Sequence, residues 1–316
     1  MIQNIGDCPN SLNPFDTGPV LMKVLITGSS GLIGTALSKS LTAGGHSAIR
    51  LQRQNNDPDS PVWDPENCLK DLARVGEIYA VVHLAGENIA DGRWSKTKKN
   101  RILNSRVKGT KLLAEYFANS NQKPLVIISA SAVGFYGDRG AEIVDEDSKA
   151  GNGFLANVCV QWEDALKVAV EAGIRVIKVR FGTVLSKKGG ALKKMLLPFK
   201  LGLGGVFGSG EQYMSWVSID DAVAMIQYVM TNDSLQGPVN FVTPNALNNR
   251  KFTKSLGQVL SRPTIFPLPA FAARIALGEM ANELLLSSNR VYPSKLMESG
   301  YKFLHPELNQ ALINLK

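Results

Sequence analysis

Short apolar runs alternate with longer amphipathic stretches over the first 185 residues of the chain. Runs rich in Val, Ile and Leu are typical of strands buried on both faces of a parallel sheet. They cover residues 23–27, 47–51, 79–84, 125–129 and 175–180. Apolar residues at helical spacing predict helices over 35–42, 98–117 and 155–172. Strands that alternate with helices predict an α/β fold with a Rossmann-type doubly wound parallel sheet.

The pattern changes after Leu185. Glycines crowd the stretch from residue 189 to residue 210, which predicts a loop-rich segment that could cover a ligand. Helical spacing returns over residues 221–230, 252–260 and 270–286. We therefore expect a Rossmann domain over 22–185, to which later segments return, and a smaller C-terminal mixed α/β substrate lobe over 186–316.

The first 21 residues contain Asp and Pro and lack the basic-then-apolar order of a signal peptide. We interpret residues 1–21 as a disordered leader, with Met22 as a natural first residue of the folded part. No apolar run approaches the roughly 18 residues that a membrane span needs. We therefore expect a cytoplasmic protein with no membrane partner.

The chain has 316 residues, a net charge of +8 and three cysteines. The positive charge suits a phosphate-bearing ligand. Because no nucleic-acid motif accompanies it, we expect no nucleic-acid partner. The cysteines form no CxxC pair and there are only three histidines, so we expect no metal site and a reducing compartment.

A glycine-rich loop, GSSGLIG, follows the first predicted strand and opens a helix, which is the context that makes such a motif credible. Gly28 permits the tight turn, Gly31 lets the backbone approach a pyrophosphate, and Gly34 lets the helix pack closely on the strand. The helix N-terminus offers free N–H groups to the phosphates. We assign the whole loop to dinucleotide binding: Gly28, Ser29, Ser30, Gly31, Leu32, Ile33 and Gly34.

The end of the second predicted strand indicates which dinucleotide is bound. An NAD site carries Asp or Glu about 20 residues after the loop, where it binds the ribose hydroxyls. This chain has Leu51-Gln52-Arg53 there and no acid before Asp57. Arg53 would pair with a 2′-phosphate, and a plain surface arginine is the alternative. NADP(H) is therefore the preferred cofactor, with NAD(H) as the second choice.

Several longer stretches carry a family resemblance. They are LITGSSGLIG (25–34), HLAGENI (83–89), SASAVGFYGDRG (129–140), VRFGTVLSKKGGALKKMLLPFKLGLGG (179–205), GSGEQYMSWVSIDD (208–221) and FTKSLGQVLSRPTIFPLPA (252–270). With these stretches the chain resembles the extended short-chain dehydrogenase/reductases. More narrowly, it is similar to epimerase-family proteins that carry a C-terminal domain of unknown function. Members are often labelled nucleoside-diphosphate-sugar epimerases, and some cyanobacterial and plastid relatives are labelled cell-division inhibitors.

The resemblance implies roles for three groups of residues. The cofactor path would be lined by Leu84, Ala85 and Gly86. Ser131 would match the active-site Ser/Thr of the superfamily. The Gly-rich segment with Gln212 and Trp216 would border the substrate pocket. The helix over 155–172 often joins a dimer in this superfamily, which leaves a homodimer open.

The chain departs from the resemblance at the acid/base pair. The family uses Tyr-x-x-x-Lys, in which the Lys lowers the pKa of the tyrosine beside the nicotinamide. Glu163 matches the helix Glu that follows this pattern in the family. Counting back, Cys159 stands at the Lys position and Leu155 at the Tyr position, and no other Tyr-x-x-x-Lys occurs in the chain.

Other residues are candidates for the missing chemistry. Ser131 could hydrogen-bond a substrate oxygen, or simply cap a turn at the end of its strand. Tyr136 could donate a proton from the following loop, or be a packed aromatic. Cys159 could be a nucleophile, although an inert buried thiol is the stronger interpretation.

Further candidates surround the end of the strand over 79–84. Glu87 and Asn88 follow that strand and are expected to face the substrate pocket, with Glu87 as a candidate base. The densest basic stretch covers residues 93–111, and its default interpretation is a solvated helix face. The alternative is docking of an anionic substrate or partner. Arg106 is then the best candidate, because relatives of known chemistry usually carry Asn at that position.

Two functions follow from these residues. The first is an NADP(H)-dependent oxidoreductase or epimerase that acts on a small substrate, with a nucleotide-linked compound as one option. The second is a non-catalytic NADP(H)-binding protein that regulates a partner, for example in cell division. The fold and the cofactor loop favour the first function, and the missing Tyr and Lys favour the second.

Overall fold

The protein is described here from a computed structural model, which covers residues 21–53, 61–65, 68–70 and 72–313. The leader expected over residues 1–21 lies almost entirely outside the described residues. Within the described ranges, no helix is both long enough and apolar enough to cross a membrane.

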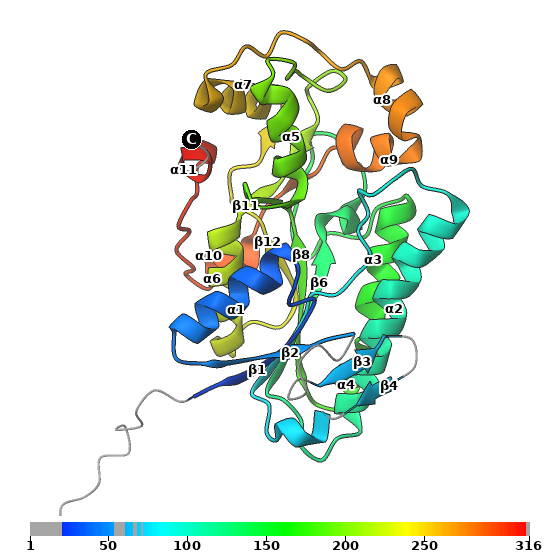
Figure 1. Ribbon diagram of the computed structural model, residues 1–316, viewed down its shortest axis with the longest axis vertical. Coiled ribbons are helices and arrows are strands. Elements are labelled where there is room, and N and C mark those ends of the chain that lie inside the picture. Colours follow the sequence, from blue (N-terminus) through cyan, green and yellow to red (C-terminus); the bar gives the residue numbers. More distant parts are fainter. Residues whose placement is uncertain (1–20, 54–60, 66–67, 71, 314–316) are drawn as a thin grey trace, which may run out of the picture.

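A six-stranded parallel sheet forms the centre of the molecule (Figure 1). Its strands are β1 (Lys23–Thr27), β2 (Ser47–Leu51), β5 (Ala80–His83), β6 (Val126–Ala132), β8 (Arg175–Phe181) and β12 (Gly237–Phe241). Their order across the sheet is β12-β8-β6-β5-β1-β2, and all pairs are parallel. The chain leaves β1 for β2 on one side and returns through β5 on the other side. The strand order therefore reverses between β1 and β5, and the predicted doubly wound α/β fold is confirmed.

Alternate residues of the strands face two separate apolar cores. Val24 and Ile26 pack with residues of one helical layer, whereas Leu25 between them packs with the other. The first layer contains α1 (Leu32–Ala43) and α6 (Ile219–Thr231). The second contains α2 (Lys96–Ala118), α3 (Phe154–Asp164) and α4 (Lys167–Glu171). Because both faces of the sheet are covered, its strands read as nearly continuous apolar runs.

Two predicted helices are interrupted in the structure. The helix predicted over 155–172 is divided into α3 and α4. The helix predicted over 270–286 becomes α8 (Ala270–Leu277), α9 (Glu279–Ala281) and a π-helical segment, Asn282–Leu286. Gly278, with φ +63°, separates α8 from α9, because glycine adopts this left-handed conformation without a steric cost.

The stretch predicted as loop-rich contains a helix, α5 (Gly190–Lys200). Its apolar residues Leu192, Leu196 and Phe199 pack against α7 (Asn249–Leu260). The glycines misled the prediction because they gather at both ends of this helix rather than inside it. Strand β12 was also not predicted, since its sequence GPVNF starts with Gly-Pro and has no apolar run.

Small elements complete both parts of the molecule. The short helices are α10 (Ser294–Glu298) and α11 (Leu308–Leu312), and two 3-10 turns cover Leu72–Val75 and Val133–Tyr136. The short strands pair as β3 (Val62–Asp64) with β4 (Cys68–Lys70), β7 (Ile143–Val144) with β14 (Arg290–Val291), β9 (Thr183–Leu185) with β11 (Trp216–Ser218), and β10 (Tyr213–Met214) with β13 (Leu247–Asn248).

Candidate functional site

The glycine loop meets the end of β5 where the strand order reverses. Gly28 has φ +65°, and a β-carbon on it would lie 2.8 Å from the carbonyl carbon of Leu84. Any side chain at residue 28 would therefore push apart the loops that follow β1 and β5. Ligands of open α/β sheets bind in the crevice at this position. The structure thus brings the predicted loop next to Leu84, Ala85 and Gly86.

The start of α1 has the form that a phosphate needs. A β-carbon on Gly34 would lie 2.3 Å from the carbonyl oxygen of Gly28, so the helix can pack this closely only with glycine there. Gly31 is the N-cap residue, no side chain caps the helix, and its first turn holds no acidic residue. The first-turn N–H groups remain for a ligand. These residues fit the pyrophosphate of a dinucleotide.

The other predicted cofactor residues differ in exposure. Ser29 is buried and its carbonyl oxygen accepts a hydrogen bond from Thr35 Oγ1 at 3.2 Å, whereas Ser30 is exposed. Leu32 is half-buried, and Ile33 packs on the α1 side of the sheet. The contacts of these side chains with a cofactor stay predictions.

Arg53 lies just beyond β2, at the edge of the sheet that carries the glycine loop, and its side chain is exposed. An exposed arginine at this edge is open to a 2′-phosphate and equally to solvent. Its pairing with NADP(H) therefore stays a prediction.

A chain of buried hydrogen bonds ties the crevice to the α2–α3 layer. Thr27 Oγ1 accepts from the N–H groups of Leu84 and Ala85, at 3.1 and 3.2 Å. The hydroxyl of Thr27 then donates its proton to His83 Nδ1, 2.7 Å away. His83 Nε2 lies 2.9 Å from Thr110 Oγ1, which also accepts from Trp162 Nε1. These partners assign to His83 a neutral ring with its proton on Nε2.

Burial also favours the neutral form of His83. The ring is fully buried, and desolvation of the charged form lowers its pKa to about 4. His83 therefore stays neutral and holds the turn after β5 in place. Sequence reasoning missed this role, although a histidine in an otherwise apolar strand was the available signal.

Glu87 is held by two cations rather than free to take a proton. Its Oε1 lies 2.7 Å from Lys98 Nζ and 2.8 Å from Arg101 Nη2. The hydrogen bond from Lys98 lowers the pKa of the carboxyl group, against a smaller opposing effect of burial. A base of lowered pKa is weak, so the geometry argues against Glu87 as a general base. Asn88 is exposed, and its Oδ1 accepts from the N–H of Ala90 at 3.0 Å.

Arg106 lies against the cofactor-path turn. A β-carbon on Gly86 would lie 3.3 Å from Arg106 Cζ, and the guanidinium stacks over the ring of Trp162 at 5.0 Å. Its Nη1 donates to the carbonyl oxygens of Glu87 and Ile102, at 3.0 and 3.1 Å. Burial lowers the pKa of Arg106, and the side chain keeps its charge because arginine is not deprotonated in proteins. The structure therefore holds a cation beneath the crevice.

The same cation interacts electrostatically with Cys159, the residue at the family's Lys position. Cys159 is buried, its Sγ lies 3.7 Å from the carbonyl oxygen of Ala132, and burial raises its pKa to about 11. A thiol of raised pKa holds its proton and does not attack. The inert interpretation of Cys159 is therefore the one that the geometry favours.

Ser131 belongs to a buried charged network. Its Oγ donates to Glu163 Oε1 at 2.7 Å. The two carboxylate oxygens of Glu163 also accept from Arg180, from Nε and Nη2, at 2.9 Å each. Because the Ser131 proton goes to Glu163, this hydroxyl can offer a ligand only a lone pair.

Tyr136 occupies the far side of this network. It is fully buried, its hydroxyl donates to Asn240 Oδ1 at 2.7 Å, and it accepts from Arg180 Nη1 at 3.0 Å. Burial raises its pKa to about 12, despite the nearby Arg180. The expectation of a proton donor at Tyr136 is therefore corrected. The hydroxyl has no open side toward a substrate, and the packed-aromatic alternative describes it.

The two predicted pocket residues of the C-terminal lobe differ. Trp216 is fully buried in the core beside α5 and α7, and its Nε1 donates to the carbonyl oxygen of Asn245. This corrects its expected place at the pocket, because an enclosed indole cannot touch a substrate. Gln212 is half-buried, and its Nε2 donates to the carbonyl oxygens of Phe207 and Leu285. Gln212 thus joins the Gly-rich segment to the π-helical segment.

At least half of the eight cations in the basic stretch over 93–111 form ion pairs with acidic residues. Besides the pairing with Glu87, Lys99 Nζ lies 2.8 Å from Glu279 Oε1, and Lys111 pairs with Glu115. Acidic partners from three parts of the chain therefore reach this helix face. The alternative of an anion-docking surface loses support there, and Arg106 beneath it is the exception.

A contact missed in the sequence joins the C-terminal lobe to α3. The carboxylate of Glu283 accepts from the N–H groups of Phe154 and Leu155, at 3.1 and 3.2 Å. A β-carbon on Gly153 would lie 2.6 Å from Glu283 Oε1, so this approach needs glycine. The helix that carries Leu155 and Cys159 is thus capped by a residue of the π-helical segment. No local sequence signal could indicate this partner.

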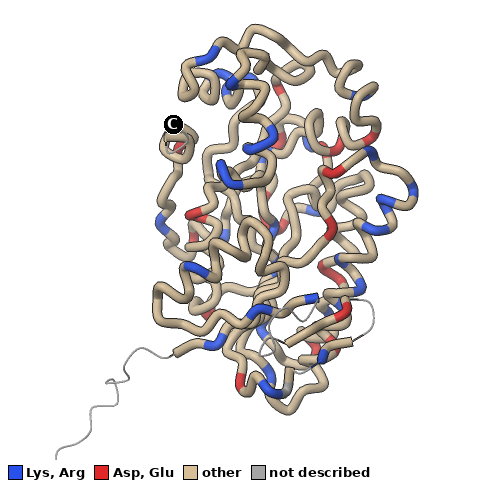
Figure 2. Tube along the Cα trace, viewed as in Figure 1, with Lys and Arg blue, Asp and Glu red and all other residues tan. Residues whose placement is uncertain are grey.

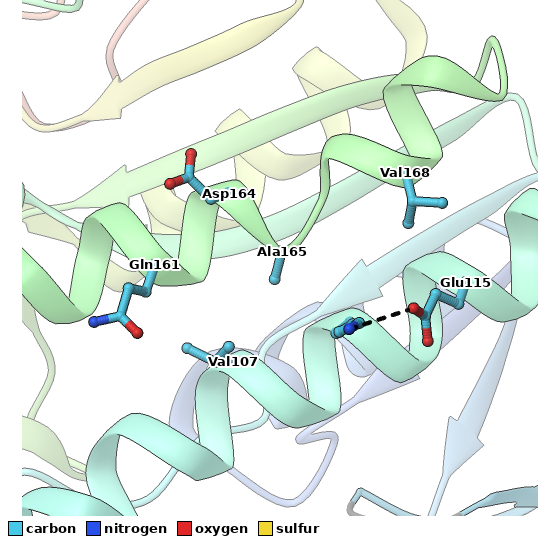
Figure 3. A pocket seen from close by; sticks show the side chains of 7 residues that line it. Val107, Glu115, Gln161, Asp164, Ala165 and Val168 are labelled. Carbon is cyan, nitrogen blue, oxygen red and sulfur yellow. Dashed lines mark ion pairs between the residues drawn. The ribbon is translucent and has the colours of Figure 1, made fainter.

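A groove of about 360 Å³ lies away from the crevice, between α2 and the α3–α4 pair (Figure 3). It is lined by Val107, Lys111, Glu115, Gln161, Asp164, Ala165 and Val168. None of these residues belongs to the predicted cofactor site. The groove lies on the helix face that the family resemblance connects with dimers.

Comparison with known proteins decides the family. The model of the NAD dependent epimerase/dehydratase family matches residues 24–242. The chain belongs to this family. A domain of unknown function, DUF1731, matches residues 268–315. The resemblance expected from the sequence is therefore confirmed, including its C-terminal domain.

Family members of known sequence and structure cover nearly the whole chain. An epimerase family protein of Mycobacterium bovis is 42% identical over 290 residues, which are 92% of this chain and 96% of that protein. The crystal structure of human epimerase family protein SDR39U1 (isoform 2) with NADPH is similar with a TM-score of 0.85 and 34% identity, covering 93% of this chain and 98% of that one.

A nucleoside-diphosphate sugar epimerase from Corynebacterium glutamicum gives a TM-score of 0.77 and 38% identity, covering 92% of this chain and 57% of that one. The human structure shows that a similar family protein binds NADPH. The family's fold and the glycine crevice of this chain agree with that finding.

Proposed function

We propose that this protein binds NADP(H) in the crevice between β1 and β5 and uses it in oxidoreductase or epimerase chemistry on a small, nucleotide-linked substrate. The approach of Gly28 to Leu84 carries the proposal, because it brings two loops together around the space that a dinucleotide needs. A similar family protein crystallised with NADPH supports the choice of cofactor.

Each part of the crevice would hold one part of the cofactor. The first-turn amides of α1 would bind the pyrophosphate, and Arg53 would pair with the 2′-phosphate. Leu84, Ala85 and Gly86 would line the path toward the nicotinamide, which supplies or accepts a hydride when bound. Arg106, directly under Gly86, would contribute a fixed positive charge at that end.

The proton-transfer partner would differ from that of other family members. With Leu155 and Cys159 in place of Tyr and Lys, the helix α3 offers no hydroxyl or ammonium group at those positions. Ser131 would contribute as a hydrogen-bond acceptor, since Glu163 takes its proton. Asn88 and Gln212 remain the candidates for substrate contact from the two lobes.

A second function is favoured by the interior position of Tyr136. With this hydroxyl buried, and without the Tyr-x-x-x-Lys pair, the chain would bind NADP(H) and regulate a partner without turnover. The groove on α2 and α3 would then be a surface to examine for a second copy of the chain. In both functions the cofactor occupies the same crevice.

Fluorescence titration with NADPH and NADH tests the cofactor, on the wild type, on Arg53→Ala and on Arg50→Ala as the matched control. Arg50 is also exposed and lies on β2, three residues before Arg53. We expect NADPH to bind more tightly than NADH, and this preference to fall about tenfold in Arg53→Ala only, as for one lost charge-assisted contact. Failure of both nucleotides to bind would contradict both functions.

Turnover then separates the two functions. NADPH consumption is followed with a panel of carbonyl compounds, and epimer formation is followed with nucleoside-diphosphate sugars. Product formation that disappears in Gly34→Ala supports the enzyme. Binding without turnover of any compound in the panel supports the regulatory protein.

A further inference from the structure

Two segments of the C-terminal lobe contain no acidic residue. Residues 187–210 and 249–278 hold ten basic side chains and neither Asp nor Glu: Lys187, Lys188, Lys193, Lys194, Lys200, Arg250, Lys251, Lys254, Arg262 and Arg274. The whole chain has 35 basic and 27 acidic residues. Without these ten, 35 − 10 leaves 25 basic against 27 acidic residues. These two segments therefore carry a large share of the basic residues and none of the acidic ones.

The two segments lie together in space. Helices α5 and α7 share one apolar core, which includes Leu196 and Leu256. The N–H of Leu268 donates to the carbonyl oxygen of Val206, and the N–H of Gly208 donates to that of Leu268. Figure 1 shows α5, α7 and α8 at the same end of the molecule, and in Figure 2 blue positions mark these helices. The charge of the two segments is thus concentrated at one end.

Large apolar side chains project from the same segments. Leu197 on α5 and Leu201 at the C-cap of this helix are 66% and 65% exposed. Ile265 and Phe266, on the connection from α7 to α8, are 71% and 54% exposed. Phe271 and Ile275 on α8 are 66% and 71% exposed. We call these six residues, with the ten basic ones, the basic-apolar face.

Apolar and basic residues share the same exposed helix surface. Lys193 and Leu197 on α5 and Leu201 at its C-cap follow at intervals of four residues and are all exposed, so they form one stripe. On α8, Phe271 and Ile275 are also four apart, and exposed Arg274 lies beside Ile275. Two cations of this face also pair with acidic residues outside the segments, Lys194 with Asp91 and Arg250 with Glu211.

We propose that the basic-apolar face docks on an anionic lipid surface. Its apolar side chains would enter the headgroup boundary, and its Lys and Arg side chains would pair with lipid phosphates. The contact would be peripheral and reversible, since the described helices offer no membrane span. The expectation of no membrane partner rested on the lack of a spanning run, and surface docking is a different mode of contact.

Charge and side-chain type favour an anionic lipid surface over a second copy of the chain and over single-stranded nucleic acid. A second copy of the chain, joined through the same face, would set ten cations against ten cations. A single-stranded nucleic acid needs aromatic platforms on which bases stack, and four of the six exposed residues are Leu or Ile. An anionic bilayer satisfies both the charge and the aliphatic side chains.

The test uses the full-length protein and sedimentation with phosphatidylcholine vesicles, with and without phosphatidylglycerol. We expect binding at least about tenfold tighter to the anionic vesicles, weakening as salt rises. Leu201→Gln/Ile275→Gln and Lys193→Gln/Lys200→Gln/Arg262→Gln should each lower this binding about tenfold. All five positions are exposed, so the melting temperature should stay unchanged.

Matched controls lie on other faces of the molecule. Leu125→Gln/Leu304→Gln removes two side chains that are 62% and 57% exposed. Lys149→Gln/Lys167→Gln removes two exposed cations. Both control variants should bind the anionic vesicles like the wild type.

Several results would overturn the proposal. These are absence of binding to anionic vesicles, equal binding to both vesicle types, or an equal loss of binding in the control variants. If the wild type binds no vesicles, and analytical ultracentrifugation shows a dimer that the Leu201→Gln/Ile275→Gln variant loses, the face would instead bind a second copy of the chain. Tight binding of single-stranded DNA through the basic residues, without vesicle binding, would assign it to nucleic acid.

Discussion

Glu163 and Arg180 form a two-point ion pair inside the protein, with Nε–Oε1 and Nη2–Oε2 distances of 2.9 Å each. Their side chains are 7% and 4% exposed. The pair joins α3 to β8, and it also orients Ser131 through a third hydrogen bond. The position of this candidate site residue therefore depends on a charge pair that solvent does not reach.

Replacing one partner of this pair should be costly. Glu163→Gln would leave Arg180 charged and uncompensated in the interior, which typically destabilises a protein by about 3–5 kcal/mol. Urea unfolding measures the loss. Glu142→Gln is the control, because its partner Arg139 lies at the surface and such pairs contribute at most about 1 kcal/mol. Equal losses in the two variants would contradict the argument.

The neutral state of His83 should make stability depend on pH. Its pKa is about 4 in the folded protein and about 6.5 when unfolded. Below pH 6.5 the unfolded state takes up the proton first, so stability is complete above pH 6.5 and falls between pH 6.5 and pH 4. The total loss should be about 3 kcal/mol.

The contribution of His83 is obtained by difference from His83→Gln, measured by urea unfolding over the same pH range. The pH dependence of the free energy of unfolding that the wild type shows and the variant lacks is the contribution of His83. Parallel curves for the two proteins would show that His83 is not the titrating group.

A methyl group at the start of α1 should remove cofactor binding. In Gly34→Ala the new β-carbon would lie 2.3 Å from the carbonyl oxygen of Gly28, so the loop must move. We expect NADPH affinity to fall more than about tenfold, because the amides no longer converge on the pyrophosphate. Gly44→Ala, at the other end of the same helix, has only ordinary contacts at 3.5 Å and should bind like the wild type. Fluorescence titration distinguishes the two.

Placing the family's Lys at residue 159 should destabilise the protein, and less so when Arg106 is also replaced. Cys159→Lys places a second cation in the buried surroundings of Arg106, and we expect a loss of about 2–4 kcal/mol. Adding Arg106→Asn should recover part of this loss. A double-mutant cycle by thermal or urea unfolding measures the coupling. Additive effects of the two substitutions would mean that the side chains do not interact.

Local sequence features were enough to predict the sheet and the glycine crevice. Buried parallel strands must be apolar on both faces, and Gly28 and Gly34 are required by backbone contacts within one βαβ unit. The first two strands were therefore predicted to the residue. Strand β12 was missed because Asn240 and a Gly-Pro start replace the apolar run. The buried amide of Asn240 accepts from the Tyr136 hydroxyl and donates to the carbonyl oxygen of Tyr292.

The polar interior could not be predicted because its partners are far apart in the sequence. Ser131 and Tyr136 were suitable residues by type and position. Only the fold shows that Glu163 takes the proton of one and that Arg180 and Asn240 enclose the other. The same holds for Trp216, whose burial depends on helices α5 and α7 that the Gly-rich pattern concealed.

The cap on α3 has a consequence for how the chain is completed during synthesis. Phe154 and Leu155 leave the ribosome 129 and 128 residues before Glu283, the acid that accepts their N–H groups. Until that acid is made, the growing chain holds every strand of the sheet but exposes the first amides of α3. The helix at the candidate site thus acquires its final neighbour only when translation is nearly finished.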